Sequence, residues 1–212
     1  MRGNPGHIVE RVAALSGIVA VVLIFVYIAA GAPEGDPEDP STSIAAAMAA
    51  NQDSARTAAY VGLAAAFALL WFVAYLHGQL RRAEGGDGWL ATVALGGGLL
   101  AIAMLLVEVS FTLAESTLGS YDADTQVAKT YLIYHWWFAS VLAPGLGALV
   151  AASTLVGWRF GALPRWLNWL GTAIVALMLL AISQTPGLAA ALGALWIIPA
   201  SIALCLRVGQ ER

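Results

Sequence analysis

The hydrophobic positions along the chain form six long runs, which short polar segments separate. About 20 residues of helix cross roughly 30 Å of hydrocarbon, and each run has about that length or more. Because lipid cannot satisfy free backbone N–H and C=O groups, an open chain crosses it only as helices. The pattern predicts an all-α bundle of six transmembrane helices, forming one domain over 1–212, with spans near 9–31, 57–80, 88–114, 131–157, 166–184 and 187–207.

The segment between the first two runs is the one long connection. Its first part combines Pro33, Pro37 and Pro40 with acidic residues, a composition typical of an extended, solvated chain. Its second part begins with Ser and Thr residues that can cap a helix and continues as an alanine-rich stretch to about Asn51. We therefore expect a short outer amphipathic helix between the first two spans.

The first span also has features of a secretory signal peptide. It has an Arg-bearing start and a small-residue triplet, Ala30-Gly31-Ala32. Its apolar run is longer than the 7–15 residues usual for a signal peptide, and Pro33 would follow the cut. We expect an anchor that is not cleaved.

Composition supports a membrane protein. Sixty per cent of the residues are hydrophobic and 11% are charged, against roughly 25% charged in soluble domains. So few charges cannot cover the surface of a soluble domain of this size, which argues against a nucleic-acid binder and a water-soluble enzyme. The lipid bilayer is the expected partner. The single cysteine, Cys205, excludes an intrachain disulfide.

Lys and Arg residues predict the orientation of the bundle. If the N-terminus is cytoplasmic, eight of the ten basic residues lie inside, and only Arg56 and Lys129 lie outside. Six spans then place both termini in the cytoplasm. The eight inner residues are Arg2, Arg11, Arg81, Arg82, Arg159, Arg165, Arg207 and Arg212.

Glu108 is the candidate for chemistry, because it lies within an apolar span. A carboxyl group there costs a few kcal/mol unless it is paired, protonated or hydrated. Thr112 and Glu115 follow at i+4 and i+7, so all three residues share one helix face. They form an acidic stripe that descends from the outer surface.

The next span offers a partner for this stripe. His135 lies four residues into that span, at a depth comparable to that of Glu108. Tyr131, Tyr134 and Phe138 share its helix face. Since consecutive antiparallel helices usually touch, Glu108 and His135 are expected to share a proton or a water. The predicted ligand or ion pocket consists of Glu108, His135, Glu115, Thr112, Tyr131 and Tyr134; an interhelical clamp without a ligand is the alternative.

Cofactor chemistry has weaker support. His77 and His135 lie about 20 Å or more apart along the bundle, too far for one haem iron. No His-Glu-x-x-His motif occurs, so no metal site, cofactor or catalytic residue is assigned. The alternative function is a membrane enzyme or redox subunit that uses Glu108 and His135 as an acid–base pair or as metal or haem ligands.

Small residues within the spans predict close helix packing. The third span contains Gly96-Gly97-Gly98, with Ala101 at small-x-x-x-small spacing from Gly97. The fourth contains Pro144, Gly145 and Gly147 near its middle. Such residues let helix backbones approach closely in lipid, where apolar surface alone gives no preference for helix over lipid.

Three stretches carry a family resemblance. They are Trp71-Phe72 followed by 80–86 (Leu-Arg-Arg-Ala-Glu-Gly-Gly), the glycine triplet 96–98, and 163–171 (Leu-Pro-Arg-Trp-Leu-Asn-Trp-Leu-Gly). Together they resemble an actinobacterial family of small multi-pass membrane proteins of unknown function. The resemblance implies a fold and a bacterial plasma membrane, and no reaction.

The sequence thus predicts a multi-pass plasma-membrane protein that is not expected to be an enzyme. It would bind a small ligand or ion in an outward-facing polar pocket, or serve as an accessory subunit. A membrane-protein partner or a second copy of the chain would then complete it. The third alternative is that the chain is a structural partner of another protein and has a packed core.

Overall fold

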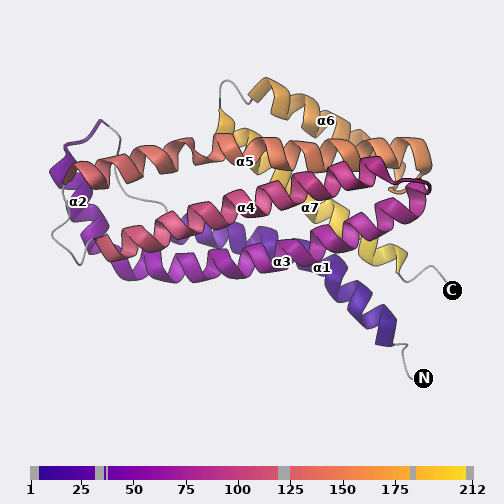
Figure 1. Ribbon diagram of the computed structural model, residues 1–212, viewed down its shortest axis with the longest axis horizontal. Helices are drawn as coiled ribbons and strands as arrows, with labels where there is room; N and C mark the ends of the chain where they lie inside the picture. The colour runs from indigo at the N-terminus through magenta and orange to yellow at the C-terminus, as the bar shows by residue number, and fades with distance from the viewer. Residues whose placement is uncertain (1–4, 32–35, 37, 119–124, 182–184, 209–212) are drawn as a thin grey trace.

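The computed structural model describes residues 5–31, 36, 38–118, 125–181 and 185–208 (Figure 1). Within these residues the chain forms helices and no strands, as the sequence predicts. The helices are α1 (Pro5–Gly31), α2 (Ser41–Ala50), α3 (Gln52–Glu84), α4 (Trp89–Leu118), α5 (Thr125–Phe160), α6 (Arg165–Ala181) and α7 (Pro186–Arg207).

Five of these helices, and not six, are long and apolar enough to cross a membrane: α1, α3, α4, α5 and α7. The predicted span 166–184 corresponds to α6, which has 17 residues. At 1.5 Å per residue it is about 26 Å long, less than the roughly 30 Å of a hydrocarbon layer. The last residues of that predicted span, 182–184, lie outside the described residues. The prediction of six spans is therefore wrong, although a multi-pass membrane protein is supported.

The five long helices form a closed ring. Along the ring, α1 packs against α3, α3 against α4, α4 against α5, α5 against α7, and α7 against α1. The shorter α6 lies outside this ring, against α5 and α7, and returns the chain towards the start of α7 (Figure 1). As a result, α1 begins and α7 ends at the same end of the bundle (Figure 1).

The opposite end of the bundle carries the predicted short helix, α2. One face of α2 buries Ile44 and Met48 against Ala128 and Leu132 of α5. Polar contacts hold the same junction, since the Lys129 ammonium donates to the Asp39 carbonyl over 3.1 Å. The outer helix is thus packed on an extension of α5 and is not a free loop segment.

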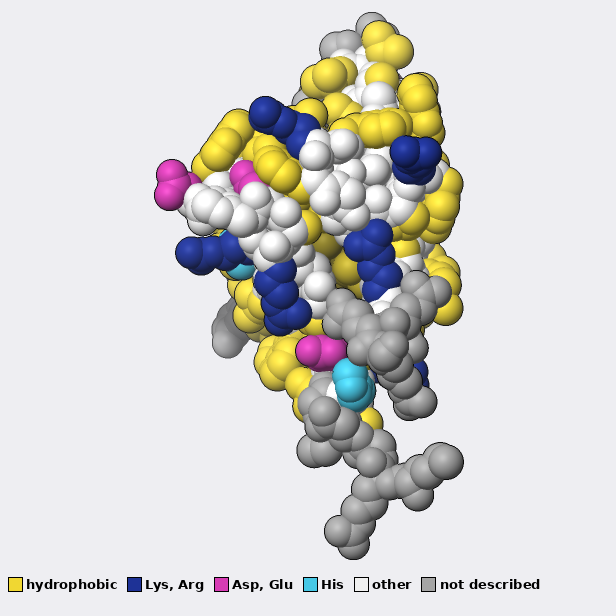
Figure 2. All heavy atoms as spheres, turned by 90° about the vertical axis from the view of Figure 1, so that its right-hand side faces the viewer, with side chains coloured by type: hydrophobic (Ala, Val, Ile, Leu, Met, Phe, Trp, Pro, Cys, Tyr) yellow, Lys and Arg dark blue, Asp and Glu magenta, His cyan; other side chains and the backbone are white. Residues whose placement is uncertain are grey.

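The end that contains the first turn of α1 and the last turn of α7 is the basic end. Figure 2 views the molecule from this end and shows Lys and Arg side chains spread across it. The described basic residues at this end are Arg11, Arg81, Arg82, Arg159, Arg165 and Arg207, while Arg56 and Lys129 belong to helix starts at the other end. Arg2 and Arg212 lie outside the described residues.

A tight turn at the basic end joins α3 to α4. Gly85, Gly86 and Gly88 all have positive φ, a backbone conformation that favours glycine. The Glu84 carboxylate accepts hydrogen bonds from the Leu90 and Ala91 amides, at 3.0 and 2.8 Å. It therefore satisfies two of the free N–H groups at the start of α4 and places a negative charge at the positive end of its dipole.

The predicted packing of small residues is confirmed where α4 crosses α5. A Cβ added at Gly97 would lie 2.6 Å from the Leu149 amide nitrogen and 2.8 Å from the Gly145 carbonyl oxygen. One added at Gly145 would lie 2.8 Å from the Ala101 amide nitrogen. These helices touch backbone to backbone, so neither glycine position has room for a side chain.

A matched pair of alanine substitutions tests this crossing. We expect Gly97→Ala to lower the free energy of unfolding by about 1–3 kcal/mol, because the new methyl group meets backbone atoms that cannot move aside. Gly96→Ala should leave stability unchanged or raise it by up to about 1 kcal/mol, since Gly96 faces open space and alanine is the better helix former. Equilibrium unfolding in mixed detergent micelles measures both. Equal losses would contradict the close contact.

Candidate functional site

Glu108 of α4 and His135 of α5 form a buried ion pair. The imidazole Nδ1 of His135 contacts the Glu108 carboxylate at Oε1. The Glu108 side chain is 2% exposed, whereas that of His135 is 30% exposed. Oε2 of the same carboxylate has no hydrogen-bond partner among the described residues. The pair therefore joins a carboxylate in the interior to an imidazole at the surface, with one acceptor oxygen left over.

The rest of the acidic stripe is also buried, as one helix face should be. The Thr112 hydroxyl lies 2.8 Å from the hydroxyl of Tyr27 in α1 and 3.2 Å from the Glu108 carbonyl oxygen. It thereby links α1 to α4. Glu115 lies one turn further out and interacts electrostatically with both Glu108 and His135.

An aromatic cluster fills the space between α4 and α5 on the outer side of the ion pair. The Tyr134 ring stacks on Phe111 with 4.0 Å between the ring centroids, and Tyr131 meets the same phenyl ring edge-on at 5.5 Å. These rings pack against one another in orientations that aromatic pairs favour. The two tyrosines therefore pack against Phe111 of α4.

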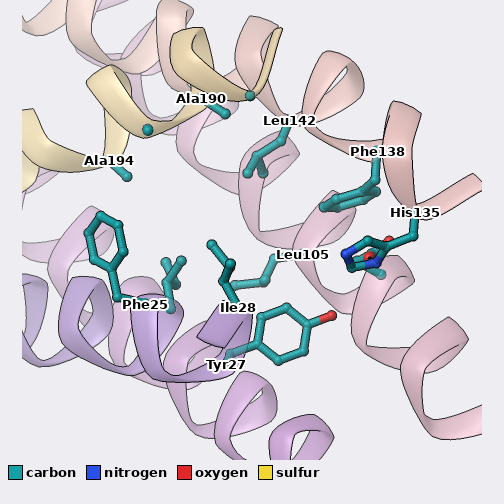
Figure 3. Close-up of a pocket in the computed structure, with 13 residues that line it drawn as sticks. Phe25, Tyr27, Ile28, Leu105, His135, Phe138, Leu142, Ala190 and Ala194 are labelled. Atoms are coloured by element: carbon teal, nitrogen blue, oxygen red, sulfur yellow. Dashed lines mark ion pairs between the residues drawn. The ribbon is translucent and has the colours of Figure 1, made fainter. Parts of the chain in front are cut away.

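A cavity of about 390 Å³ adjoins the ion pair (Figure 3). Its walls come from four helices of the ring: Ile24 to Ile28 of α1, Leu105 and Glu108 of α4, His135 to Leu142 of α5, and Gly187 to Ala194 of α7. His135 lies at one end, and Phe25 and Ala194 lie towards the other. Apart from Glu108, His135 and Tyr27, the lining side chains are apolar.

The cavity opens beside α1. Phe25 and Ile28 line it and are 43% and 51% exposed, and Gly187 at the start of α7 is exposed as well. The entrance thus lies between the outer half of α1 and the first turn of α7. The Glu108 carboxylate lies at the other end, beside the half-exposed imidazole of His135.

Two of the six residues predicted for the pocket, Glu108 and His135, line this cavity. Thr112, Glu115, Tyr131 and Tyr134 are not among its lining residues. Thr112 turns to Tyr27, and the two tyrosines turn to Phe111. Helix-face spacing places residues on one side of a helix, but it does not say which neighbour each side chain meets.

Sequence reasoning missed Tyr27, Phe111 and the residues of α7 that line the cavity. Tyr27 stands near the outer end of the first span, where an aromatic side chain is also typical of an interface anchor. Phe111 follows Glu108 by three residues, so its place on the same side of α4 was available from spacing. The α7 wall consists of Gly and Ala residues, which give no chemical signal.

Within the described residues, no group of three or more His, Cys, Asp or Glu side chains is placed to hold a metal ion. His77 lies at the basic end, where its Nδ1 is 3.0 Å from the Ala91 carbonyl oxygen. It thus belongs to the α3–α4 junction. His77 therefore supplies no further ligand to a metal or haem site at Glu108 and His135.

No protein-family model, curated protein or solved structure matches the chain. The resemblance to the actinobacterial family stays a prediction. The cavity and the ion pair are the features that bear on function.

A double-mutant cycle on Glu108→Gln and His135→Asn tests whether the two residues stabilise each other. Removing His135 alone leaves a buried carboxylate unpaired, whereas removing both charges does not. We expect a coupling free energy of about 1–3 kcal/mol in equilibrium unfolding.

The control cycle uses His7 and Glu10, which form an ion pair of the same chemistry at 3.8 Å with side chains that are 45% and 37% exposed. Its coupling should be about 0–0.5 kcal/mol, because water screens exposed pairs. Couplings of equal size in the two cycles would show that burial contributes nothing.

Proposed function

We propose that the protein is a multi-pass protein of a bacterial plasma membrane that binds a small ligand in an outward-facing cavity ending at Glu108 and His135. The observation that carries this proposal is the unpartnered Oε2 of a 1% exposed glutamate in the wall of an open cavity. Buried carboxylates are expensive, and a free acceptor in a cavity wall is a group that a ligand can satisfy.

The charge distribution supports an orientation with the basic end in the cytoplasm. Six described Arg residues lie at that end, against Arg56 and Lys129 at the other. Arg and Lys are enriched in the cytoplasmic segments of membrane proteins. Both termini would then be cytoplasmic, and α2 with the cavity would face the outside.

Helix lengths support a position for the cavity at the outer boundary of the bilayer. A rise of 1.5 Å per residue from Trp89 reaches about 30 Å near residue 109 of α4. On α5, the same length counted back from Phe160 at the basic end reaches about residue 140, so His135 lies just beyond it. The polar end of the cavity would thus lie at the membrane surface, with its apolar walls in the hydrocarbon layer.

Cavity size supports a small ligand. Binding pockets for small molecules usually have volumes of roughly 300–1,000 Å³, and this one has about 390 Å³. Since a water molecule takes about 30 Å³ in the liquid, the space corresponds to roughly a dozen heavy atoms. The mixture of apolar walls and a few converging polar groups is also typical of such sites.

Cysteine labelling tests the orientation in a Cys205→Ser background. A cysteine that replaces Asn51, between α2 and α3, should react with a membrane-impermeant maleimide in intact cells. Asp87→Cys, in the exposed turn at the basic end, should react only after lysis. The reverse pattern would overturn the proposed orientation.

Reaction of a cavity-lining cysteine tests whether small molecules enter. In the same background, Ala194→Cys should be modified in the folded protein by methyl methanethiosulfonate, a small uncharged thiol reagent, because Ala194 lines the cavity. Mass spectrometry of the intact protein measures the rate of modification.

The matched control is Ala200→Cys on the same helix, since Ala200 is fully buried and does not line the cavity. We expect modification of Ala194→Cys to be at least about tenfold faster, because the control thiol reacts only when the bundle opens. Equal rates, with both cysteines reactive after denaturation, would contradict an open cavity and with it the proposed function.

A further inference from the structure

We infer that the cavity takes a single-chain amphiphile with an ammonium head, whose charge meets Glu108 while its alkyl chain lies between α1 and α7. This inference rests on the proposed function and adds the chemical class of the ligand. It follows from three features of the cavity: the free carboxylate oxygen at its polar end, the apolar lining of its remainder, and the lack of a Lys or Arg among the described residues that line it.

The polar end of the cavity favours a cation. Among the described residues that line the cavity, Glu108 is the one acidic residue and His135 is the one basic residue. The imidazole of His135 already pairs with Oε1 of Glu108, which leaves Oε2 without a partner. An ammonium group has three N–H donors and no acceptor, so it can donate to Oε2 and to the hydroxyl oxygen of Tyr27, a residue that also lines the cavity.

The rest of the cavity favours an alkyl chain. From His135 to Leu142 on α5, and from Gly187 to Ala194 on α7, the wall extends seven residues, or about 10 Å of helix. Along this length the lining side chains are Phe, Leu, Ile and Ala. Figure 3 shows Phe25 and Ala194 facing each other across the end away from His135. One alkyl chain fits there, and its burial supplies about 0.8 kcal/mol per CH₂ group relative to water.

A free alkylamine suits the site better than an aminophospholipid. Among the described residues no Lys or Arg lines the cavity, so a phosphate group beside the ammonium would lie near the Glu108 carboxylate without such a partner. The volume of about 390 Å³ also leaves no room for a second chain. A carboxylate head, as in a fatty acid, would meet the same repulsion.

Protection of the Ala194→Cys thiol tests the inference, in the Cys205→Ser background used above. Octylamine bound with its head at Glu108 should place its tail against residue 194 and shield the thiol. At ten times its Kd, octylamine should slow modification by methyl methanethiosulfonate about tenfold, because the occupied fraction cannot react. Ethylamine has no chain to reach residue 194, so it should leave the rate unchanged.

The controls distinguish the contribution of the ammonium head from that of the alkyl chain. Octanol and octanoate carry the same chain, and neither should protect at the same concentration. Glu108→Gln should abolish protection by octylamine while the thiol stays reactive. Equal protection by octylamine and octanol, or protection that survives Glu108→Gln, would overturn the inference. So would protection by lysophosphatidylethanolamine in place of octylamine.

These outcomes differ from a failure of the proposed function. If Ala194→Cys reacts rapidly and octylamine gives no protection, the cavity is open and the assigned ligand class is wrong. If Ala194→Cys reacts no faster than Ala200→Cys, the cavity does not admit small molecules, and both proposals fall.

Discussion

A carboxyl group inside a bundle of apolar helices must have a partner, and this requirement shapes the outer half of the molecule. Removing an isolated carboxylate from water costs several kcal/mol, which is more free energy than most single contacts in a protein contribute. Glu108 meets the requirement through His135, which ties α4 to α5 at that level. Tyr27 and Thr112 then tie α1 to α4 beside it. Three helices of the ring are thus held around one acidic group.

Close helix crossings lie nearer the basic end than the cavity does. A Cβ at Gly17 of α1 would collide with the Ser201 hydroxyl of α7, and α4 touches α5 backbone to backbone at Gly97 and Gly145. The cavity begins further from the basic end on each of these helices, at Ile24, Ala194, Leu105 and Leu142. The cavity therefore lies beyond the crossings that join these helices in pairs.

Much of this fold could be predicted from the sequence, because hydrophobic runs and glycine positions act locally. The bounds of α1 and α7 follow the apolar runs closely, and the Gly97–Ala101 spacing marked a true crossing. The error in the number of spans came from α6, whose run of apolar residues looks like the others. Its length falls just short of a bilayer, and its position outside the ring depends on packing with α5 and α7 that no local pattern records.

The ion pair of the candidate site could be predicted from the sequence, but the residues that form the walls of the cavity could not. Glu108 stands out because an acid in an apolar run is costly wherever the helix packs, and His135 follows from depth and chain order. The walls depend on α1 and α7 meeting, and these are the first and last helices of the ring. Gly187, Ala190 and Ala194 matter because they are small and leave space, which is a property of their neighbours as much as of themselves.

The aromatic cluster lies beside the cavity and does not line it. Phe111, Tyr131 and Tyr134 pack together between α4 and α5 just beyond the ion pair, and α2 packs on the same extension of α5. The exposed apolar side chains that line the cavity, Phe25 and Ile28, belong instead to α1. A ligand in the cavity therefore meets hydrocarbon side chains along most of its length and a carboxylate with a free oxygen at one end. That combination of environments selects for amphiphiles and against simple inorganic ions.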